Sequence, residues 1–452
     1  MKPLKIVDIV KAVYAIDYTS ANRFDTIDNV QFDSRLCNET SLFVPLVGTT
    51  DGHDYVDKAL ENGAKAVLWH KEQSLAPENC NVIFVDDTLE AFQKLAYFYK
   101  NLLNVRVVGV TGSNGKTTTK DMIAAILSKK YTVYKTQGNY NNDIGVPKTL
   151  LDMPENTQVA VVEMGMDGFN QINRLSHIAQ PEISVITLIG DSHLEFLKTR
   201  EGIAKAKLEI LEGMPNESVL IVPQNEPLLN QTFDGITVQT FGVSNESTLQ
   251  LLDIQTSEQE TTFKVQQFSD SQFTLPIIGA YNALNAGAAL LVGQYFGVAV
   301  NNMQEALATF VLTANRTQWI KGMNGNDVLN DAYNASPTSM KAILKDFQAI
   351  DTTMKKYAIL GDMRELGENT SALHESVAQA INLDVLEHVY LYGKEMENLY
   401  TALNNRDKVS YYPLNAKDEL IKDCQKHIRD AKVLVKSSFG TNLLEVVEAL
   451  KG

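Results

Sequence analysis

The chain has 452 residues, of which 44% are hydrophobic and 21% are charged. At roughly 150 residues per domain this length predicts about three domains, and the composition excludes a largely disordered chain, a collagen-like repeat and a membrane bundle. Lysine and arginine number 40 against 55 aspartates and glutamates, a net charge of −15, so we expect no nucleic-acid partner.

The N-terminal segment and the cysteines indicate the compartment. Lys5, Asp8 and Lys11 interrupt the apolar residues of the first segment, which therefore lacks the continuous apolar core of a secretory signal. No segment approaches the ~20 uninterrupted apolar residues of a spanning helix. The three cysteines are odd in number and far apart, unlike a disulfide framework. We expect a cytoplasmic monomer without membrane insertion.

The order of strand-like and helix-like segments divides the chain into three α/β domains. Residues 1–100 mix short apolar runs with turns, which is typical of a small α/β domain. Over 101–313, buried strand patterns alternate with amphipathic helices, which favours a doubly wound and mainly parallel sheet. Alternating patterns at 248–278 predict an antiparallel excursion within this domain. A further βα series over 314–452 predicts a smaller nucleotide-binding-like sheet.

A phosphate-binding loop is predicted where the first strand of the second domain ends. The buried pattern at 105–110 runs directly into TGSNGKTT, and an amphipathic helix follows. Glycines let backbone N–H groups wrap a phosphate, a lysine supplies charge, and a threonine hydroxyl can ligate Mg²⁺. The alternative is a Gly-rich turn with a surface lysine. The predicted nucleotide-binding residues are Gly112, Ser113, Asn114, Gly115, Lys116, Thr117 and Thr118.

Three polar residues further along are candidates for a site at the strand ends. Glu163 ends the strand pattern VAVVEMG, His193 follows the strand pattern ISVITLI, and Lys207 lies in the helix pattern KAKLEI. Each also has a simpler interpretation when it is taken alone. These are a glutamate paired with an arginine, a structural histidine and a solvated lysine.

The form TGxxGKT, followed by a strand-end glutamate, HLE and AKxEI, resembles the ATP site of the Mur ligase superfamily, which forms amide bonds in cell-wall and folate metabolism. The resemblance implies ATP and two Mg²⁺ ions as cofactors. It also implies that Thr117, Glu163 and His193 bind magnesium, and that Lys207 is carbamylated to give a further ligand. The catalytic residues are then expected to be Lys116, Lys207, His193 and Arg316.

Further segments extend the resemblance over nearly the whole chain. It implies a uridine-nucleotide domain at 1–100, an ATP-binding domain at 101–313 and a Rossmann-like domain at 314–452. Asn285 in GAYNALNA is the expected adenine contact, Arg316 the expected phosphate contact and Asp331 in NDAYNA the expected ribose contact. The expected substrate-binding residues are Ser34, Arg35, Asn139, Asn142 and Asn334.

Several of these segments have other interpretations. Residues 33–35 can form an Asx turn, the polar GNYNNDIG can be an ordinary turn, and Asn282 can cap its helix. An arginine between domains is usually part of a salt bridge. Three residues depart from those usual in the family: Leu188, Asn330 and Phe439.

The most selective segment is GDMRELG at 361–367, with His374 and Val377 downstream. This pattern resembles the family members that join D-Ala-D-Ala to UDP-MurNAc-tripeptide through an acyl phosphate, in peptidoglycan precursor biosynthesis. His374 is alternatively a helix-surface residue. The other functions that we consider are a sister Mur ligase, a folylpolyglutamate synthetase-like ligase and, in a different class, a non-catalytic nucleotide-dependent switch. The third tripeptide residue stays open between Lys and diaminopimelate.

Overall fold

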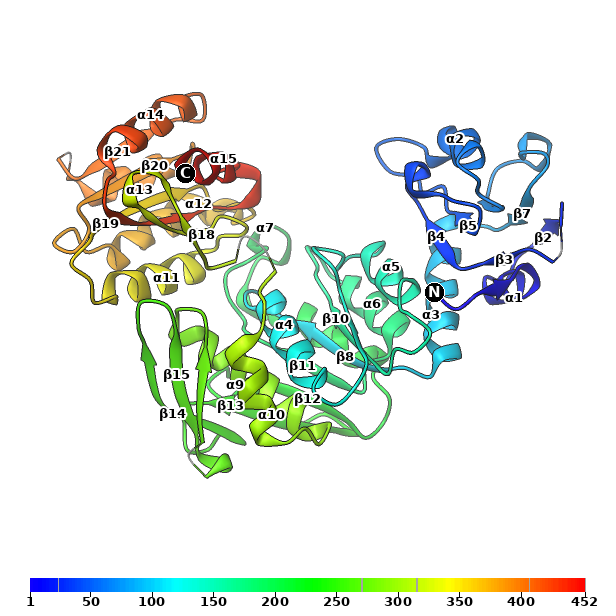
Figure 1. Ribbon diagram of the computed structural model, residues 1–452, viewed down its shortest axis with the longest axis horizontal. Helices are drawn as coiled ribbons and strands as arrows, with labels where there is room; N and C mark the ends of the chain where they lie inside the picture. Colours follow the sequence, from blue (N-terminus) through cyan, green and yellow to red (C-terminus); the bar gives the residue numbers. More distant parts are fainter. Residues whose placement is uncertain (23, 270, 314–315, 406, 452) are drawn as a thin grey trace.

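The computed structural model describes residues 1–22, 24–269, 271–313, 316–405 and 407–451. They form three α/β units in succession, each built on its own main sheet (Figure 1). The α/β class and the mainly parallel second sheet were predicted correctly. The predicted boundary at 313/314 falls beside residues 314 and 315, which lie outside the described residues.

The first unit has a five-stranded sheet of order β2-β7-β6-β5-β4, in which only the edge strand β2 is antiparallel. Every residue of β5, β6 and β7 is buried, as expected for parallel strands covered on both faces. The strands are β2 (Asp17–Thr19), β4 (Asn29–Gln31), β5 (Ser41–Phe43), β6 (Ala66–Trp69) and β7 (Asn81–Phe84). The pair β1 (Leu4–Lys5) and β3 (Thr26–Ile27) and the helices α1 (Ile6–Ala12) and α2 (Val56–Glu61) complete it.

The helix α3 (Thr88–Leu103) joins the first unit to the second. Asp87 caps its start by accepting the N–H of Glu90, and left-handed Asn104 ends it. Its buried side chains belong to one hydrophobic core that contains strands of the first sheet and the helix α5 (Gly145–Leu151). The hydroxyl of Tyr99 donates to the carbonyl of Met153 at 2.8 Å. The first and second units therefore share a core.

The second unit has a nine-stranded sheet of order β16-β15-β14-β13-β12-β11-β8-β10-β9. Pairing is parallel from β9 to β14, and β15 and β16 are antiparallel, so the predicted excursion is confirmed. The strands are β8 (Arg106–Thr111), β9 (Val133–Lys135), β10 (Val159–Glu163), β11 (Ile183–Ile186), β12 (Ser218–Pro223), β13 (Ile236–Gly242), β14 (Leu249–Thr256), β15 (Thr261–Val265) and β16 (Ser271–Leu275).

Helices cover both faces of this sheet because successive strand residues face opposite cores. Val107 packs in the core with α5, α6 (Gln171–Ala179) and α8 (Arg200–Leu208). Val108 packs in the core with α4 (Lys116–Leu127), α9 (Ala280–Tyr295) and α10 (Val300–Thr309). The short helix α7 (Leu194–Leu197) follows β11. The carboxyl ends of β8, β10 and β11 meet at one edge, where ligands of such sheets bind.

The third unit has a six-stranded sheet of order β17-β18-β22-β19-β20-β21, parallel except for β17. Its strands are β17 (Gln318–Lys321), β18 (Asp327–Asp331), β19 (Lys355–Gly361), β20 (His388–Tyr392), β21 (Val409–Tyr412) and β22 (Ala431–Lys436). Its helices are α11 (Pro337–Ala349), α12 (Thr370–Glu375), α13 (Met396–Leu403), α14 (Lys417–His427) and α15 (Leu444–Leu450). Ser336 and Ser339 form a capping box at the start of α11.

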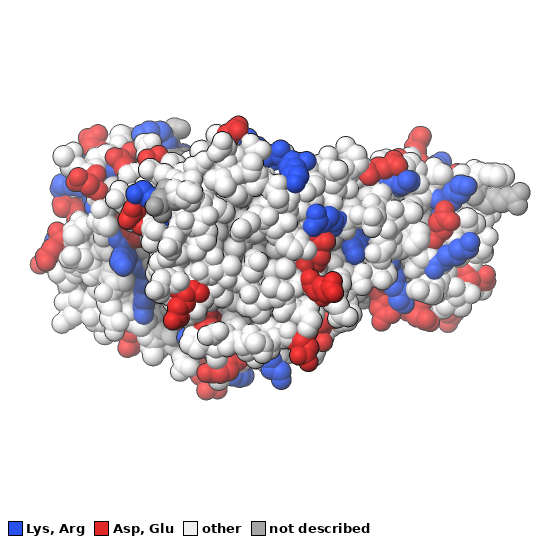
Figure 2. Space-filling model, turned by 90° about the horizontal axis from the view of Figure 1, so that it is seen from below, with Lys and Arg blue, Asp and Glu red and all other residues white. Residues whose placement is uncertain are grey.

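The first and third units lie at opposite ends of the molecule, with the second between them (Figure 1). The middle of the face in Figure 2 carries few charged side chains, and basic and acidic residues are intermixed around it. In the part of the chain that the structure describes, no helix is both long and apolar enough to span a membrane.

Candidate active site between the second and third units

The phosphate loop lies between the end of β8 and the start of α4, and two of its positions require glycine. Gly112 and Gly115 have φ angles of +148° and +82°. A Cβ at Gly112 would lie 1.9 Å from the hydroxyl oxygen of Thr187, and one at Gly115 would lie 2.6 Å from Oδ1 of Asn285. The loop is therefore packed directly against β11 and α9, where neither position has room for a side chain.

The other loop residues are held by the segment after β11 and by the loop itself. The N–H of Ser113 donates to the carbonyl of Leu188 at 2.8 Å, and its hydroxyl accepts the N–H of Gly190 at 2.9 Å. Leu188 thus contributes its backbone, which the departure from the family pattern does not alter. Lys116 Nζ donates to the carbonyl of Gly112 at 2.7 Å. Burial lowers the pKa of Lys116, and the nearby carboxylate of Glu163 opposes this.

Glu163 ends β10 as a buried carboxylate, with 2% of its surface exposed. Its Oε1 accepts from Asn141 Nδ2 at 2.9 Å, and its Oε2 lies 3.9 Å from Lys120 Nζ. Oε2 has no hydrogen-bond partner among the described residues. Pairing with an arginine is therefore the wrong interpretation, because a lysine of α4 takes that place. A buried carboxylate oxygen that accepts no hydrogen bond is suited to a cation.

Lys207 on α8 is buried, with 1% of its surface exposed. No hydrogen bond or ion pair joins its amine to another residue that the structure describes. Burial, and next the charge of Lys116, hold the pKa of Lys207 well below its ordinary value. The solvated-lysine interpretation is wrong. A buried amine of this kind is favoured in its neutral, nucleophilic form.

His193 is engaged by the third unit. Its Nδ1 lies 2.5 Å from Oε2 of Glu365, which belongs to the GDMRELG segment, and this close contact lowers the pKa of Glu365. The N–H of Glu195 donates to the carbonyl of Glu365 at 3.2 Å. The φ of His193 is +62°, in a region that few non-glycine residues adopt. The residue predicted as a metal ligand is thus also an interdomain contact.

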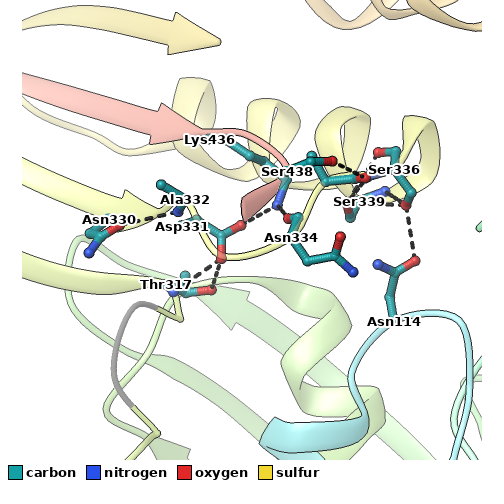
Figure 3. A network of polar contacts seen from close by, with 11 residues as sticks. Asn114, Thr317, Asn330, Asp331, Ala332, Asn334, Ser336, Ser339, Lys436 and Ser438 are labelled. Atoms are coloured by element: carbon teal, nitrogen blue, oxygen red, sulfur yellow. Dashed lines mark hydrogen bonds and ion pairs between the residues drawn. The ribbon is translucent and has the colours of Figure 1, made fainter. Parts of the chain in front are cut away.

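The network in Figure 3 surrounds the end of β18. Asp331 accepts the N–H of Thr317 at 3.2 Å and pairs with Lys436 Nζ at 2.5 Å (Figure 3). The guanidinium of Arg316 lies over the ring of Tyr333, 4.2 Å from its centroid. No ion pair joins Arg316 to a carboxylate of the described residues, so the salt-bridge interpretation is wrong.

Side chains of the phosphate loop and of the segment after β11 touch the third unit directly. Oδ1 of Asn114 accepts from the hydroxyl of Ser336 at 3.1 Å (Figure 3). The hydroxyl of Thr338 donates to Asp191 at 3.0 Å. The start of α11 therefore lies against the phosphate loop.

Two cavities lie between the second and third units and share Arg316 and Asn334. The first cavity has a volume of about 260 Å³, and the second has about 690 Å³. The predicted residues that line the first cavity are Asn114, Gly115, Thr118, Asn285, Arg316, Asp331 and Asn334. Those that line the second cavity are Thr117, Asn139, His193, Arg316 and Asn334. Phe439, which departs from the family pattern, also lines the second.

Other predicted residues lie outside both cavities. Ser34 is buried in the first unit, whereas Arg35 is exposed and pairs with Asp33, whose side chain also accepts the N–H of Arg35. The expected Asx turn is therefore present. Asn142 accepts the N–H of Gly145 at 2.9 Å, which fixes the start of α5.

Two alternatives from the sequence are corrected by local geometry. The helix α9 begins after Gly279, and Asn282 within its first turn donates to the carbonyl of Ile278, so Asn282 is not the cap. His374 is fully buried, and its Nε2 accepts the N–H of Met363 at 3.0 Å, so it is not a surface residue. It fixes the GDMRELG segment from inside the third unit.

The sequence reasoning missed a buried charge cluster on α4. Asp121 accepts the N–H and the hydroxyl of Thr313 at 2.8 Å and 2.9 Å, and it pairs with Lys135 at 2.6 Å. The cluster ties the phosphate-loop helix to the segment that leads to Arg316. The available signal was the pair Lys120 and Asp121, which lies one helical turn after Lys116 and directly precedes the apolar half of the helix.

The comparisons with known proteins agree with this arrangement. Three family models match the chain: "Mur ligase family, catalytic domain" at 26–100, "Mur ligase middle domain" at 110–293 and "Mur ligase, glutamate ligase domain" at 315–439. The UDP-N-acetylmuramoyl-tripeptide–D-alanyl-D-alanine ligase of Bacillus subtilis is 43% identical over 94% of this chain and 93% of its own length.

Two solved structures have the same three-domain fold. MurF from Acinetobacter baumannii is 26% identical, with a TM-score of 0.89, over 100% of this chain and 99% of that one. The MurF ligase from Thermotoga maritima, in complex with ADP, is 28% identical, with a TM-score of 0.82, over 93% of this chain and 96% of that one. The chain belongs to the Mur ligase family.

Proposed function

We propose that this chain is an ATP-dependent ligase that joins D-Ala-D-Ala to UDP-MurNAc-tripeptide in the synthesis of peptidoglycan precursors. The B. subtilis relative is named for this activity, and the T. maritima structure contains ADP. The structural observation that carries the proposal is the pair of cavities that meet at Arg316 and Asn334. One adjoins the phosphate loop and α9, and the other extends to the third unit, so a nucleotide and a peptide can react where they meet.

The nucleotide is assigned to the first cavity. Asn285 would contact the adenine. Asp331 would contact the ribose hydroxyls, because Lys436 and Thr317 hold its carboxylate in place. The phosphates would lie at the start of α4, where free backbone N–H groups and the helix dipole favour anions. Arg316, which lines both cavities, would contact the terminal phosphate.

The reaction has two steps. A carboxylate oxygen of the tripeptide attacks the γ-phosphorus of ATP, and the bond between that phosphorus and the bridging oxygen of the β-phosphate breaks. The products of this step are ADP and the acyl phosphate of the tripeptide. The amine of D-Ala-D-Ala then attacks the carbonyl carbon, the carbon–oxygen bond to the phosphate breaks, and the amine loses its proton. Lys116 and Arg316 would stabilise charge on the transferring phosphoryl group.

The residues present fit magnesium. Thr117 offers a hydroxyl and Glu163 an oxygen that accepts no hydrogen bond, and Mg²⁺ prefers oxygen ligands while keeping several waters. Within the described ranges, no group of three or more His, Cys, Asp and Glu side chains is placed to hold a metal. When bound, two such ions would neutralise the charge on the phosphates and the donor. His193 would take part through Nε2 while Nδ1 stays on Glu365, because a metal-binding histidine commonly keeps a carboxylate on its other ring nitrogen.

The remaining assignments are proposals that rest on the resemblance. Ser34 and Arg35 would contact the uridine nucleotide, and Asn139 and Asn142 would line the path of the donor. The chain would divide at 1–100, 101–313 and 314–452, and the protein would be a cytoplasmic monomer. Lys207 would carry a carbamate, because burial favours its neutral amine.

Phosphate release from ATP tests the proposed function. D-Ala-D-Ala should stimulate release in the presence of UDP-MurNAc-tripeptide, and Lys116→Ala should abolish it because the variant lacks the charge beside the transferring phosphate. The folded state of the variant is checked by its melting temperature. Greater stimulation by L-Lys, diaminopimelate or glutamate would favour a sister ligase. No stimulation by any acceptor would favour the nucleotide-dependent switch.

A further inference from the structure

Arg364 is a second cation of the second cavity, and the proposed phosphoryl transfer gives it no role. Arginines elsewhere on the surface, such as Arg106 and Arg174, are paired with a carboxylate. Arg316 and Arg364 are joined by no ion pair to a carboxylate of the described residues, and both line the second cavity. Arg316 also lines the first cavity, beside the assigned nucleotide, whereas Arg364 does not. Arg364 is thus available for a different anion.

The guanidinium of Arg364 is held in place by the loop after β22. Its Nη2 donates to the carbonyl of Gly440 at 2.7 Å, and the backbone N–H of Arg364 donates to the hydroxyl of Ser438 at 3.0 Å. A Cβ at Gly440 would lie 2.3 Å from Nη1, so the guanidinium packs directly on the backbone there. A guanidinium has five N–H donors, and one carbonyl leaves most of them for a carboxylate.

The neighbouring acidic residue makes its close contact elsewhere, and the charge of Arg364 is only a lesser cause of its lowered pKa. Glu365, the next residue in the chain, points its carboxylate to His193 of the second unit. The other groups at this end of the cavity are Ser438, Phe439 and Gly440, which carry no charge. At the Gly440 end of the second cavity, the cationic group is the partly immobilised Arg364, and Glu365, which also lines the cavity, has its close contact with His193.

At least two substrate carboxylates enter this region if the proposed function, on which the inference rests, is correct. The reacting carboxylate of the tripeptide must reach the phosphate near Thr117, on the second unit. The terminal carboxylate of the acceptor lies at the far end of a dipeptide, and two residues span at most about 7 Å. We infer that Arg364 binds the terminal carboxylate of D-Ala-D-Ala, so that a dipeptide has its amine at the reaction centre and its carboxylate on the third unit.

The test compares two acceptors on variants of the full-length protein. The acceptors are D-Ala-D-Ala and its uncharged amide, D-alanyl-D-alaninamide, with ATP and UDP-MurNAc-tripeptide saturating. Arg364→Ala removes the side chain, and Arg364→Gln removes the charge but keeps a donor for the Gly440 carbonyl. Lys394→Ala is the matched control, because that lysine is 81% exposed and lies outside the cavity.

The wild-type protein should prefer the carboxylate acceptor by about 10- to 100-fold in kcat/KM, as expected for a charge-assisted pair. Both Arg364 variants should raise KM for D-Ala-D-Ala by a similar factor and leave the amide nearly unchanged, so that the preference disappears. Lys394→Ala should keep it. KM for ATP and for the tripeptide should not change.

Three results would overturn the inference. The Arg364 variants would keep the preference for the carboxylate, or Arg364→Ala would raise KM for the tripeptide instead, which would assign Arg364 to the donor. The third result concerns the wild-type protein. If its phosphate release does not respond to D-Ala-D-Ala, the proposed function is refuted, and the inference with it. Arg364→Gln separates a misfolded site from a loss of carboxylate recognition. If this variant still uses the amide acceptor with an unchanged kcat/KM, its site is intact.

Discussion

The chemistry of single residues in this protein depends on burial, and Lys207 shows this most clearly. Its amine is enclosed on α8 near Lys116, and its pKa lies well below the ordinary value because the enclosed site disfavours charge. A neutral amine can attack CO₂ and, with loss of one proton, form a carbamate. We expect purified protein in ¹³C-bicarbonate to show a carbamate signal by ¹³C NMR.

That signal should vanish in Lys207→Ala and persist in Lys205→Ala, whose lysine lies two residues away on the exposed face of α8. Lys207→Ala should also lose nearly all turnover and regain part of it with a short added carboxylate such as acetate. A signal that survives Lys207→Ala, or that disappears with Lys205, would assign the carbamate elsewhere or remove it.

Residue types and spacing predicted which side chains to inspect but not their surroundings. The loop from Gly112 to Thr118 was predicted because glycine, lysine and threonine at this spacing follow from local backbone chemistry. The burial of Lys207 and His374 was not predictable, because it depends on side chains that are distant in the sequence. The same limit hid Lys120, whose partners Glu163 and Thr136 come from other strands or loops.

At the scale of elements, the GDMRELG segment is held by one buried histidine on α12. His374 Nε2 accepts the N–H of Met363, and Nδ1 donates to the carbonyl of Thr370 at 2.8 Å, so the folded protein requires the neutral ring. Burial lowers the pKa of His374 from 6.5. The unfolded chain therefore binds this proton first as the pH falls, and the stability that the neutral ring contributes is lost below about pH 6.5.

We expect the melting temperature of the wild-type protein to fall between pH 7 and pH 5, and to fall less steeply in His374→Gln, whose amide can still accept the Met363 N–H. One proton of this kind contributes at most about 1.4 kcal/mol per pH unit. His53 and His388, whose pKa values burial also lowers, act in the same direction, so the difference between variant and wild type is the informative quantity. His177→Gln, on the exposed side of α6, should keep the wild-type slope.

The helices and strands of the structure match those predicted from the sequence wherever the hydrophobic residues recur with a clear helix or strand period. The central strands β8, β10 and β11 of the second sheet and β19, β20 and β22 of the third are mainly apolar, and parallel strands covered on both faces produce that pattern. The sheet order was not predictable, because register depends on contacts between segments far apart in the chain. The role of α3 as a shared element was missed for the same reason, since its sequence shows an amphipathic helix and not the two units that it joins.

At the scale of the whole molecule, the two junctions between units differ in kind. The first unit shares a hydrophobic core with the second through α3. The third unit is joined to the second mainly by polar pairs, among them Asn114 with Ser336, His193 with Glu365 and Glu258 with Lys432. Ile278 of the second unit is buried in the core of the third, and Tyr281 packs against that core. Interfaces between domains that are made mainly of polar contacts resemble transient interfaces, so the third unit is the one expected to move.

The proposed site needs that movement because its residues come from both units. Lys116 and Asn285 belong to the second unit, Asp331 belongs to the third, and Arg316 lies just before the first strand of the third. Closure completes such a site and excludes water that would hydrolyse an acyl phosphate. We expect ligand-free protein to populate an open form, with a radius of gyration by X-ray scattering that falls when a non-hydrolysable ATP analogue, Mg²⁺ and UDP-MurNAc-tripeptide are added together.

Two controls assign the compaction to the third unit. UDP alone, which would engage only the first unit, should leave the radius unchanged. Arg316→Ala should reduce the compaction, because the nucleotide then loses a contact from the third-unit side of the boundary, and ligands shift an equilibrium only by their differential affinity for the two forms. An unchanged radius in the saturated wild-type protein would mean that the second and third units are already closed without ligand, as the contacts from Ser336, Glu365 and Lys432 allow.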